Sequence, residues 1–251
     1  MGNKKRLIYQ VSKLEQYYGS YKALKISKLE IHPGTIYAVI GTVGSGKSTL
    51  LNILSGVEKQ SSGDVLYDEE PFERNWLGKI VENDQVFYAS NPKLQTSNKR
   101  VSSYVSNSFG KKKNVIQNRY FNEGSFKNLW DRKIKDISKG ELHWLGMILA
   151  CEADPRVLLI DDYGMYFNGN MERDFRNQIT KMNRNLGTTI VLSAPSDVNV
   201  KHFASVLIYL DHGHISKIRT GSGKPRRNND RQKRGGYGKN RSSKRPNTNR
   251  K

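Results

Sequence analysis

A glycine-rich segment close to the start of the chain carries the residue types best suited to chemistry. Residues 41–48 fit the pattern G-x-x-x-x-G-K-[ST], in which backbone N–H groups surround the phosphates of a nucleotide. Lys47 is expected to reach the β- and γ-phosphates, and the Ser48 hydroxyl to bind Mg²⁺. The alternative is a glycine-rich turn with a solvated lysine. The other predicted phosphate-binding residues are Gly41, Gly44, Ser45, Gly46 and Thr49.

The residues on either side of this segment predict the elements that position it. Residues 36–40 are apolar, as in a buried strand, and residues 49–56 are typical of a short helix closed by glycine. A strand, a glycine loop and the amino end of a helix together form an anion site, because free N–H groups point inward and the helix dipole favours negative charge. This context distinguishes the segment from a chance match to the pattern.

A pair of carboxylates follows a second apolar segment. Residues 157–160 are Val-Leu-Leu-Ile, and Asp161 and Asp162 come directly after them. In proteins with such a phosphate loop, an acid at the end of a neighbouring strand holds Mg²⁺. We therefore predict Asp161 as a metal ligand together with Ser48.

The order of the remaining elements predicts an α/β fold. The polar segment 91–135 is expected to contain helices, and a hairpin is expected around residues 211–214. Strands that alternate with helices predict a mainly parallel sheet covered on both faces. The other expected strands are 23–31, 65–67, 80–85 and 188–193, and the other expected helices are 141–150 and 171–185.

Charge divides the chain into two parts. The formal net charge is +20, and the segment from Lys224 to Lys251 contributes +11 of it. That segment has no Ile, Leu, Val or Phe, so it cannot bury enough apolar area to offset the loss of chain entropy. We expect a compact domain over residues 1–220 and a disordered basic tail over 221–251.

Composition excludes several classes of protein. The longest apolar runs are too short to cross a bilayer, and the basic amino end lacks the apolar core of a signal peptide. The single cysteine, Cys151, cannot form an internal disulfide, which suits a reducing cytoplasm.

Taken together and in this order, the motifs resemble those of the nucleotide-binding subunit of ABC transporters over about residues 6–220. The resemblance implies that Tyr18 stacks on adenine and that Gln85 contacts both Mg²⁺ and the membrane subunit. Residues 137–141, Ile-Ser-Lys-Gly-Glu, stand at the family's LSGGQ signature. The resemblance implies that Ser138 and Gly140 contact the γ-phosphate held by a second subunit.

The resemblance also implies a fold, an activity and partners. The fold would be a P-loop cassette with an antiparallel β part near the amino end and a helical subdomain at about 86–150. The activity would be hydrolysis of ATP with Mg²⁺, coupled to closure of a homodimer or heterodimer against an integral membrane subunit. The protein would then be cytoplasmic and peripheral on the inner face of the cell membrane.

Departures from the family pattern predict weak hydrolysis. Asp162 stands where the family has the glutamate that activates water, and its side chain is shorter by one C–C bond, roughly 1.5 Å. Pro195 aligns with the switch histidine and has no side-chain donor, and none of the five histidines is a convincing substitute. Asn168 stands where the family has an aspartate in the loop after the carboxylate pair. We expect ATP to be bound well and hydrolysed slowly.

Two other functions stay open from the sequence. The tail contains Arg-Gly-Gly with a tyrosine at 234–237, a composition that suits non-specific RNA or an anionic lipid surface, although a tail that only aids solubility fits as well. One alternative is therefore a soluble ABC-type ATPase that acts on RNA or ribosomes. The other is a nucleotide-binding module that does not hydrolyse ATP.

Overall fold

The computed structural model describes residues 6–122 and 126–223. The disordered tail was predicted over 221–251, with RNA or an anionic lipid as alternative partners, and it lies outside the described residues from position 224 onward. Among the described residues, no helix combines the length and the apolar character needed to span a membrane.

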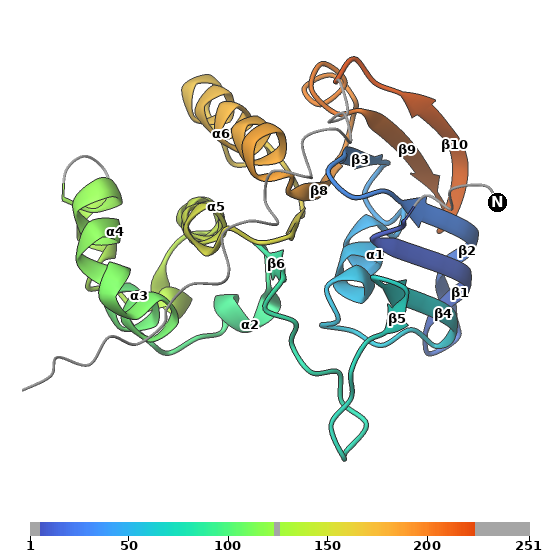
Figure 1. Ribbon diagram of the computed structural model, residues 1–251, viewed down its shortest axis with the longest axis horizontal. Helices are drawn as coiled ribbons and strands as arrows, with labels where there is room; N and C mark the ends of the chain where they lie inside the picture. Colours follow the sequence, from blue (N-terminus) through green and yellow to red (C-terminus); the bar gives the residue numbers. More distant parts are fainter. Residues whose placement is uncertain (1–5, 123–125, 224–251) are drawn as a thin grey trace, which may run out of the picture.

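A six-stranded sheet in the middle of the protein carries the glycine loop (Figure 1). Its order is β10-β9-β3-β8-β7-β6, and all neighbours are parallel except β9 and β10. The short apolar runs are buried over their whole length in β3, β7 and β8, as expected of strands covered on both faces. The strands are β3 (Ile36–Ile40), β6 (Val86–Tyr88), β7 (Val157–Ile160), β8 (Thr189–Ala194), β9 (Val206–Asp211) and β10 (His214–Thr220).

A second sheet is entirely antiparallel and has the order β2-β1-β4-β5. Helix α1 (Lys47–Leu54) lies between the two sheets, and its leucines and isoleucine join both in one apolar core. The hydroxyl of Tyr9 donates to the backbone oxygen of Leu54 at 2.7 Å, which ties the end of α1 to this second sheet. The strands are β1 (Tyr9–Tyr18), β2 (Tyr21–Ile31), β4 (Ser62–Tyr67) and β5 (Glu70–Pro71).

A group of helices lies apart from the antiparallel sheet, on the other side of β6 (Figure 1). A separate apolar cluster holds these helices together, and α5 also contributes Met147 and Ala150 to the core of the large sheet. The helices are α2 (Pro92–Gln95), α3 (Val101–Phe109), α4 (Lys113–Tyr120) and α5 (Lys139–Ala153), with short 3₁₀ turns at Gly110–Lys112, Lys127–Leu129 and Ile134–Asp136. The last helix, α6 (Gly169–Lys181), continues into a π-helical turn at Met182–Leu186. A mainly parallel sheet, an antiparallel part and a set of helices are thus confirmed.

The strand predicted at 80–85 is wrong. The side chain of Asn83 accepts a hydrogen bond from the Gln85 N–H at 2.9 Å, and the Asn83 carbonyl accepts one from the Val86 N–H at 2.9 Å. Such an Asx turn takes the backbone out of extended geometry. The strand therefore starts at Val86, and Gln85 precedes it rather than ending one.

Candidate nucleotide-binding site

The glycine loop connects the carboxyl end of β3 to the amino end of α1. Gly46 has a φ of 98° and is the N-cap of α1, and within the described residues no side chain caps this helix. A Cβ at Gly41 would lie 2.3 Å from the Leu210 backbone oxygen, and one at Gly46 would lie 2.8 Å from that of Ala23. Only glycine fits these two positions, and the helix N–H groups are left available for an anion.

Lys47 lies in this loop, near the charges of Asp161 and Asp162. Its Nζ donates to the Thr42 carbonyl at 2.8 Å, and the side chain is buried. Burial lowers the pKa of Lys47, while the charges of Asp162 and Asp161 act in the opposite direction. The ammonium group therefore lies within the field of both acids.

A cavity of about 270 Å³ lies beside the loop. Tyr18 lies on its wall, half exposed, and its hydroxyl donates to a carboxylate oxygen of Glu58 at 2.8 Å. The hydroxyl of Ser45 is buried and has no hydrogen-bond partner within the described residues. The predicted site residues that line the cavity are Tyr18, Gly44, Gly46, Lys47, Ser48, Thr49 and Asp162.

Asp161 and Asp162 follow β7 beside the end of β8. The Ser193 hydroxyl, in β8, donates to Oδ1 of Asp161 and accepts from the Asp162 N–H at 2.9 Å. Asp162 has a φ of 51°, in the left-handed region that aspartate tolerates better than most residues. Burial raises the pKa of Asp162, the Asp161 charge adds to that shift, and Lys47 opposes it.

A second cavity of about 280 Å³ lies on the other side of the carboxylates. Ser48 and Asp162 line both cavities, so they lie between the two. Asp161, Ser90 and His143 line the second one only.

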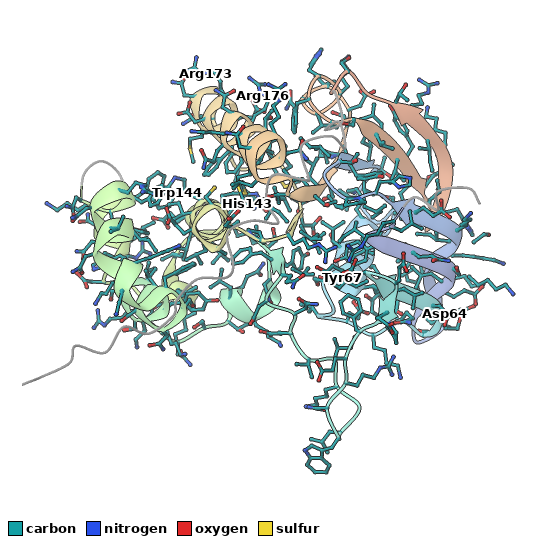
Figure 2. All side chains as sticks on the ribbon, viewed as in Figure 1. Asp64, Tyr67, His143, Trp144, Arg173 and Arg176 are labelled. Atoms are coloured by element: carbon teal, nitrogen blue, oxygen red, sulfur yellow. The ribbon has the colours of Figure 1, made fainter. Side chains whose placement is uncertain are left out.

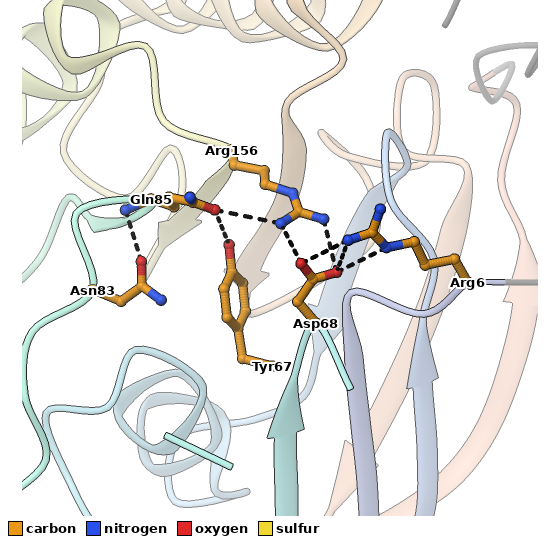
Figure 3. Close-up of polar contacts among 6 residues, drawn as sticks. All are labelled: Arg6, Tyr67, Asp68, Asn83, Gln85 and Arg156. Carbon is orange, nitrogen blue, oxygen red and sulfur yellow. Dashed lines mark hydrogen bonds and ion pairs between the residues drawn. The ribbon is translucent and has the colours of Figure 1, made fainter. Parts of the chain in front are cut away.

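Gln85 lies at the amino ends of the parallel strands, the opposite ends from Asp161, and its predicted contact with Mg²⁺ is wrong. Its Oε1 accepts hydrogen bonds from the Tyr67 hydroxyl at 3.1 Å and from Arg156 at 3.3 Å (Figure 3). Because β6 and β7 are parallel, Gln85, which precedes β6, lies at the amino ends of the strands, whereas Asp161, which follows β7, lies at their carboxyl ends. At the carboxyl ends, Ser90 lies just beyond β6, and its hydroxyl donates to the Asp161 carbonyl at 3.4 Å.

Ser138 and Gly140 begin α5. The Ser138 side chain accepts a hydrogen bond from the Glu141 N–H at 3.3 Å, and the Glu141 carboxylate accepts one from the Ser138 N–H at 2.7 Å. This capping box fixes the start of the helix. Neither Ser138 nor Gly140 lines the two cavities of its own chain.

Three residues of the site had not been predicted, namely Ser90, His143 and Ser193. Ser193 could have been recognised from the sequence, because it is a polar residue near the end of an apolar strand. Ser90 and His143 could not be recognised, because a misplaced strand concealed the first and the second is one polar residue in a largely apolar helix.

Comparison with known proteins adds an independent result. A family model described as "ABC transporter" matches residues 24–163. The maltose/maltodextrin import ATP-binding protein MalK of Escherichia coli K12 is 27% identical over 225 residues, which cover 86% of this chain and 58% of that protein. MalK of Salmonella paratyphi A matches with the same identity and coverage. The chain thus spans less than two thirds of the length of these relatives.

Solved structures share the fold. The ATP-binding cassette MJ0796 bound to ADP and Pi superposes with a TM-score of 0.69 at 17% identity, covering 84% of this chain and 98% of that one. The cbiO1 protein of Clostridium perfringens, part of the cbiONQ ABC transporter complex, gives a TM-score of 0.66 at 20% identity, covering 86% and 89%. The predicted P-loop cassette fold is confirmed.

Proposed function

This chain belongs to the ABC transporter family, and from that premise we propose that it is the ATP-binding subunit of a transporter. In this role it binds ATP with Mg²⁺, closes as a dimer and moves a separate integral membrane subunit. The observation that carries the proposal is the placement of Lys47 and Asp162 on the wall of one cavity, next to an uncapped helix terminus.

The glycine loop supplies the phosphate site in this proposal. The backbone N–H groups of the loop that have no carbonyl partner, with those of the first turn of α1, bind the phosphate oxygens, and Lys47 binds the terminal phosphates. Tyr18 stacks on the adenine at the mouth of the cavity.

Ser48 and Asp161 are the proposed ligands of Mg²⁺. The fit is supported by their chemistry, because Mg²⁺ prefers oxygen ligands, and by Ser193, which orients Asp161. When bound, the ion neutralises charge that develops on the β- and γ-phosphate oxygens.

Hydrolysis is proposed to be slow. Asp162 is the catalytic residue, but its carboxylate is set back by roughly one C–C bond, 1.5 Å, from where a glutamate would place it. Pro195 follows β8, the strand next to β7, and offers no side-chain donor to the γ-phosphate. A misplaced general base forfeits part of a contribution that is on the order of 10²–10⁴-fold.

A head-to-tail dimer is proposed to complete the site. Ser138 and Gly140 contact the γ-phosphate bound by the partner subunit, and the partner is either a second copy or a different cassette. A role in trans is supported because neither residue lines the cavity of its own chain that contains Lys47. The relatives carry the name import ATP-binding protein. That name supports a cytoplasmic location for this chain, peripheral on the inner face of the membrane.

Turnover of the purified chain with ATP and Mg²⁺ tests the chemistry. The parent should hydrolyse ATP slowly, and Asp162→Glu should raise kcat by about tenfold or more, because it restores the reach of the base. Fast hydrolysis by the parent, unchanged by Asp162→Glu, would reject slow chemistry.

A pulldown from membranes, with and without ATP, tests the partner. An integral membrane protein should co-purify with the full chain. Recovery of RNA alone, lost at high salt, would favour the soluble ATPase instead.

A further inference from the structure

His143 lies on α5, one turn after the start of the helix. Figure 2 shows it on the side of α5 nearer the sheet, whereas Trp144 lies toward α4 and stacks on Phe126 at 3.8 Å between ring centroids. The imidazole lies against Tyr166 and Phe167, with ring centroids 5.7 and 5.1 Å away. The loop after the carboxylates therefore holds the ring in place.

The imidazole is buried with an unsatisfied nitrogen. Its exposed fraction is 7%, and Nε2 has no hydrogen-bond partner among the described residues. Leaving a buried polar atom without a partner costs about 1–3 kcal/mol, so such an atom indicates a missing water or ligand group. The ring lines the 280 Å³ cavity that also contains Asp161 and Asp162, which is roomy enough for ordered water.

The ring is neutral at neutral pH. Burial lowers the pKa of His143 to about 4, against the opposing charge of Asp161. A neutral imidazole donates from one nitrogen and accepts at the other, so it suits an ordered water better than a phosphate.

Asp162 is the geometric link to the nucleotide. It lines the cavity of His143 and also the cavity of Lys47, so water held by the imidazole has a path to the carboxylate. A carboxylate one methylene short leaves a gap that water can fill. His143 thus lines the same cavity as the proposed general base and as Ser48, the last residue of the glycine loop.

We propose that His143 is a positioning residue for ATP hydrolysis, which holds through Nε2 an ordered water that orients the carboxylate of Asp162. The inference rests on the proposed function, since it assumes ATP in the neighbouring cavity. In this proposal α5 supplies a hydrogen-bonding side chain, which Pro195 at the end of β8 cannot supply.

Two substitutions separate the nitrogen from the packing of the ring. His143→Phe keeps an aromatic ring against Tyr166 and Phe167 and removes Nε2. His143→Gln gives up the ring but places an amide group near the position of Nε2. Circular dichroism and thermal unfolding of the full chain establish that each variant is folded.

Two measurements are made on the parent and both variants. Single-turnover hydrolysis gives the rate, and calorimetry gives the affinities for ADP–Mg²⁺ and for ADP–Mg²⁺ with fluoroaluminate, a transition-state mimic that includes the attacking water. In His143→Phe we expect the rate and the fluoroaluminate affinity to fall about tenfold, the equivalent of one hydrogen bond, with ADP affinity unchanged. His143→Gln should recover most of both.

The opposite results would overturn the inference. Equal rates and fluoroaluminate affinities in the parent and His143→Phe would show that Nε2 does nothing in the reaction. A loss in His143→Gln as large as that in His143→Phe would show that the ring alone matters. If the parent binds no nucleotide, the proposed function fails, and this inference fails with it.

Discussion

Ser193 connects two neighbouring strands through the candidate metal ligand: its hydroxyl donates to Oδ1 of Asp161 and accepts from the Asp162 N–H at 2.9 Å. The parallel register that pairs Ile160 with Leu192 places these groups side by side. The sheet itself therefore sets the direction of the Asp161 carboxylate.

Ser193→Ala should weaken ATP–Mg²⁺ binding about tenfold, because a hydrogen bond to a charged group contributes roughly 1.5–3 kcal/mol. Titration calorimetry with and without Mg²⁺ measures the affinity for ATP, and the loss of affinity should appear only in the titration that contains Mg²⁺. Ser216→Ala is the control, since its hydroxyl donates only to the Tyr209 carbonyl on the outer strand pair. Equal Mg²⁺-dependent affinities in Ser193→Ala and Ser216→Ala would contradict the role of Ser193.

Gly146 allows α5 to approach the end of β6. A Cβ at this position would lie 2.1 Å from the Ala89 backbone oxygen, so Gly146→Ala must push the helix away from the strand. We expect a loss of about 1–3 kcal/mol in the free energy of unfolding, measured in urea. Gly169→Ala is the matched control, because a Cβ there meets no atom within 4 Å and the residue lies in α6. The control should be neutral or slightly stabilising.

The local parts of this site were predictable from the sequence. The glycine loop, Lys47 and Asp161 follow buried strands whose residue types identify them without any knowledge of distant contacts. The helix expected at 141–150 was likewise recognisable, and the structure starts it at Lys139, with Ser138 in a capping box with Glu141.

The parts that depend on tertiary placement were not predictable. The error at Gln85 came from an Asx turn at Asn83, whose side-chain hydrogen bond overrides the extended pattern of the neighbouring residues. His143 belongs to the site only because Gly146 lets α5 lie against β6, and no short-range pattern reports such a contact.

Asp68 is held by two arginines at the seam between the sheets (Figure 3). Arg156 makes two hydrogen bonds to it, at 2.7 and 2.9 Å, and Arg6 makes two more, at 3.0 and 2.8 Å. Arg156→Ala should lower the free energy of unfolding by about 1–2 kcal/mol at pH 7, allowing for partial solvent screening. Arg173→Ala, in an exposed ion pair 3.9 Å long, should change it by less than about 0.5 kcal/mol.

The same contact predicts a pH dependence. Arg156, more than any other group, holds the pKa of Asp68 below its ordinary value of 3.8. A lowered folded-state pKa means that the stabilisation is present above pH 3.8 and is lost as the pH falls through the folded-state pKa. The difference between the parent and Arg156→Ala should therefore shrink at low pH. A difference that stays constant from pH 7 downward would contradict the ion pair.

His143 predicts a second pH dependence, of folding rather than activity. Its pKa is about 4 in the folded chain against 6.5 ordinarily, so the unfolded chain takes up the proton first. Stability should fall as the pH drops from 6.5 toward 4, by an amount on the order of 2–3 kcal/mol over the whole range. Urea unfolding at several pH values measures this. His143→Gln should flatten the dependence, and a slope identical to the parent's would show that the imidazole is not buried in its neutral form.

The binding of ATP to the glycine loop is the claim on which the account depends, and titration calorimetry of the full chain tests it most directly. With ATP and Mg²⁺ the parent should show saturable heat from a single site, and Lys47→Ala should lose at least about tenfold in affinity, because the buried ammonium contacts the terminal phosphates. Lys28→Ala, on the exposed side of β2, should bind like the parent. No heat of binding in the parent, or equal affinity in Lys47→Ala, would contradict the account.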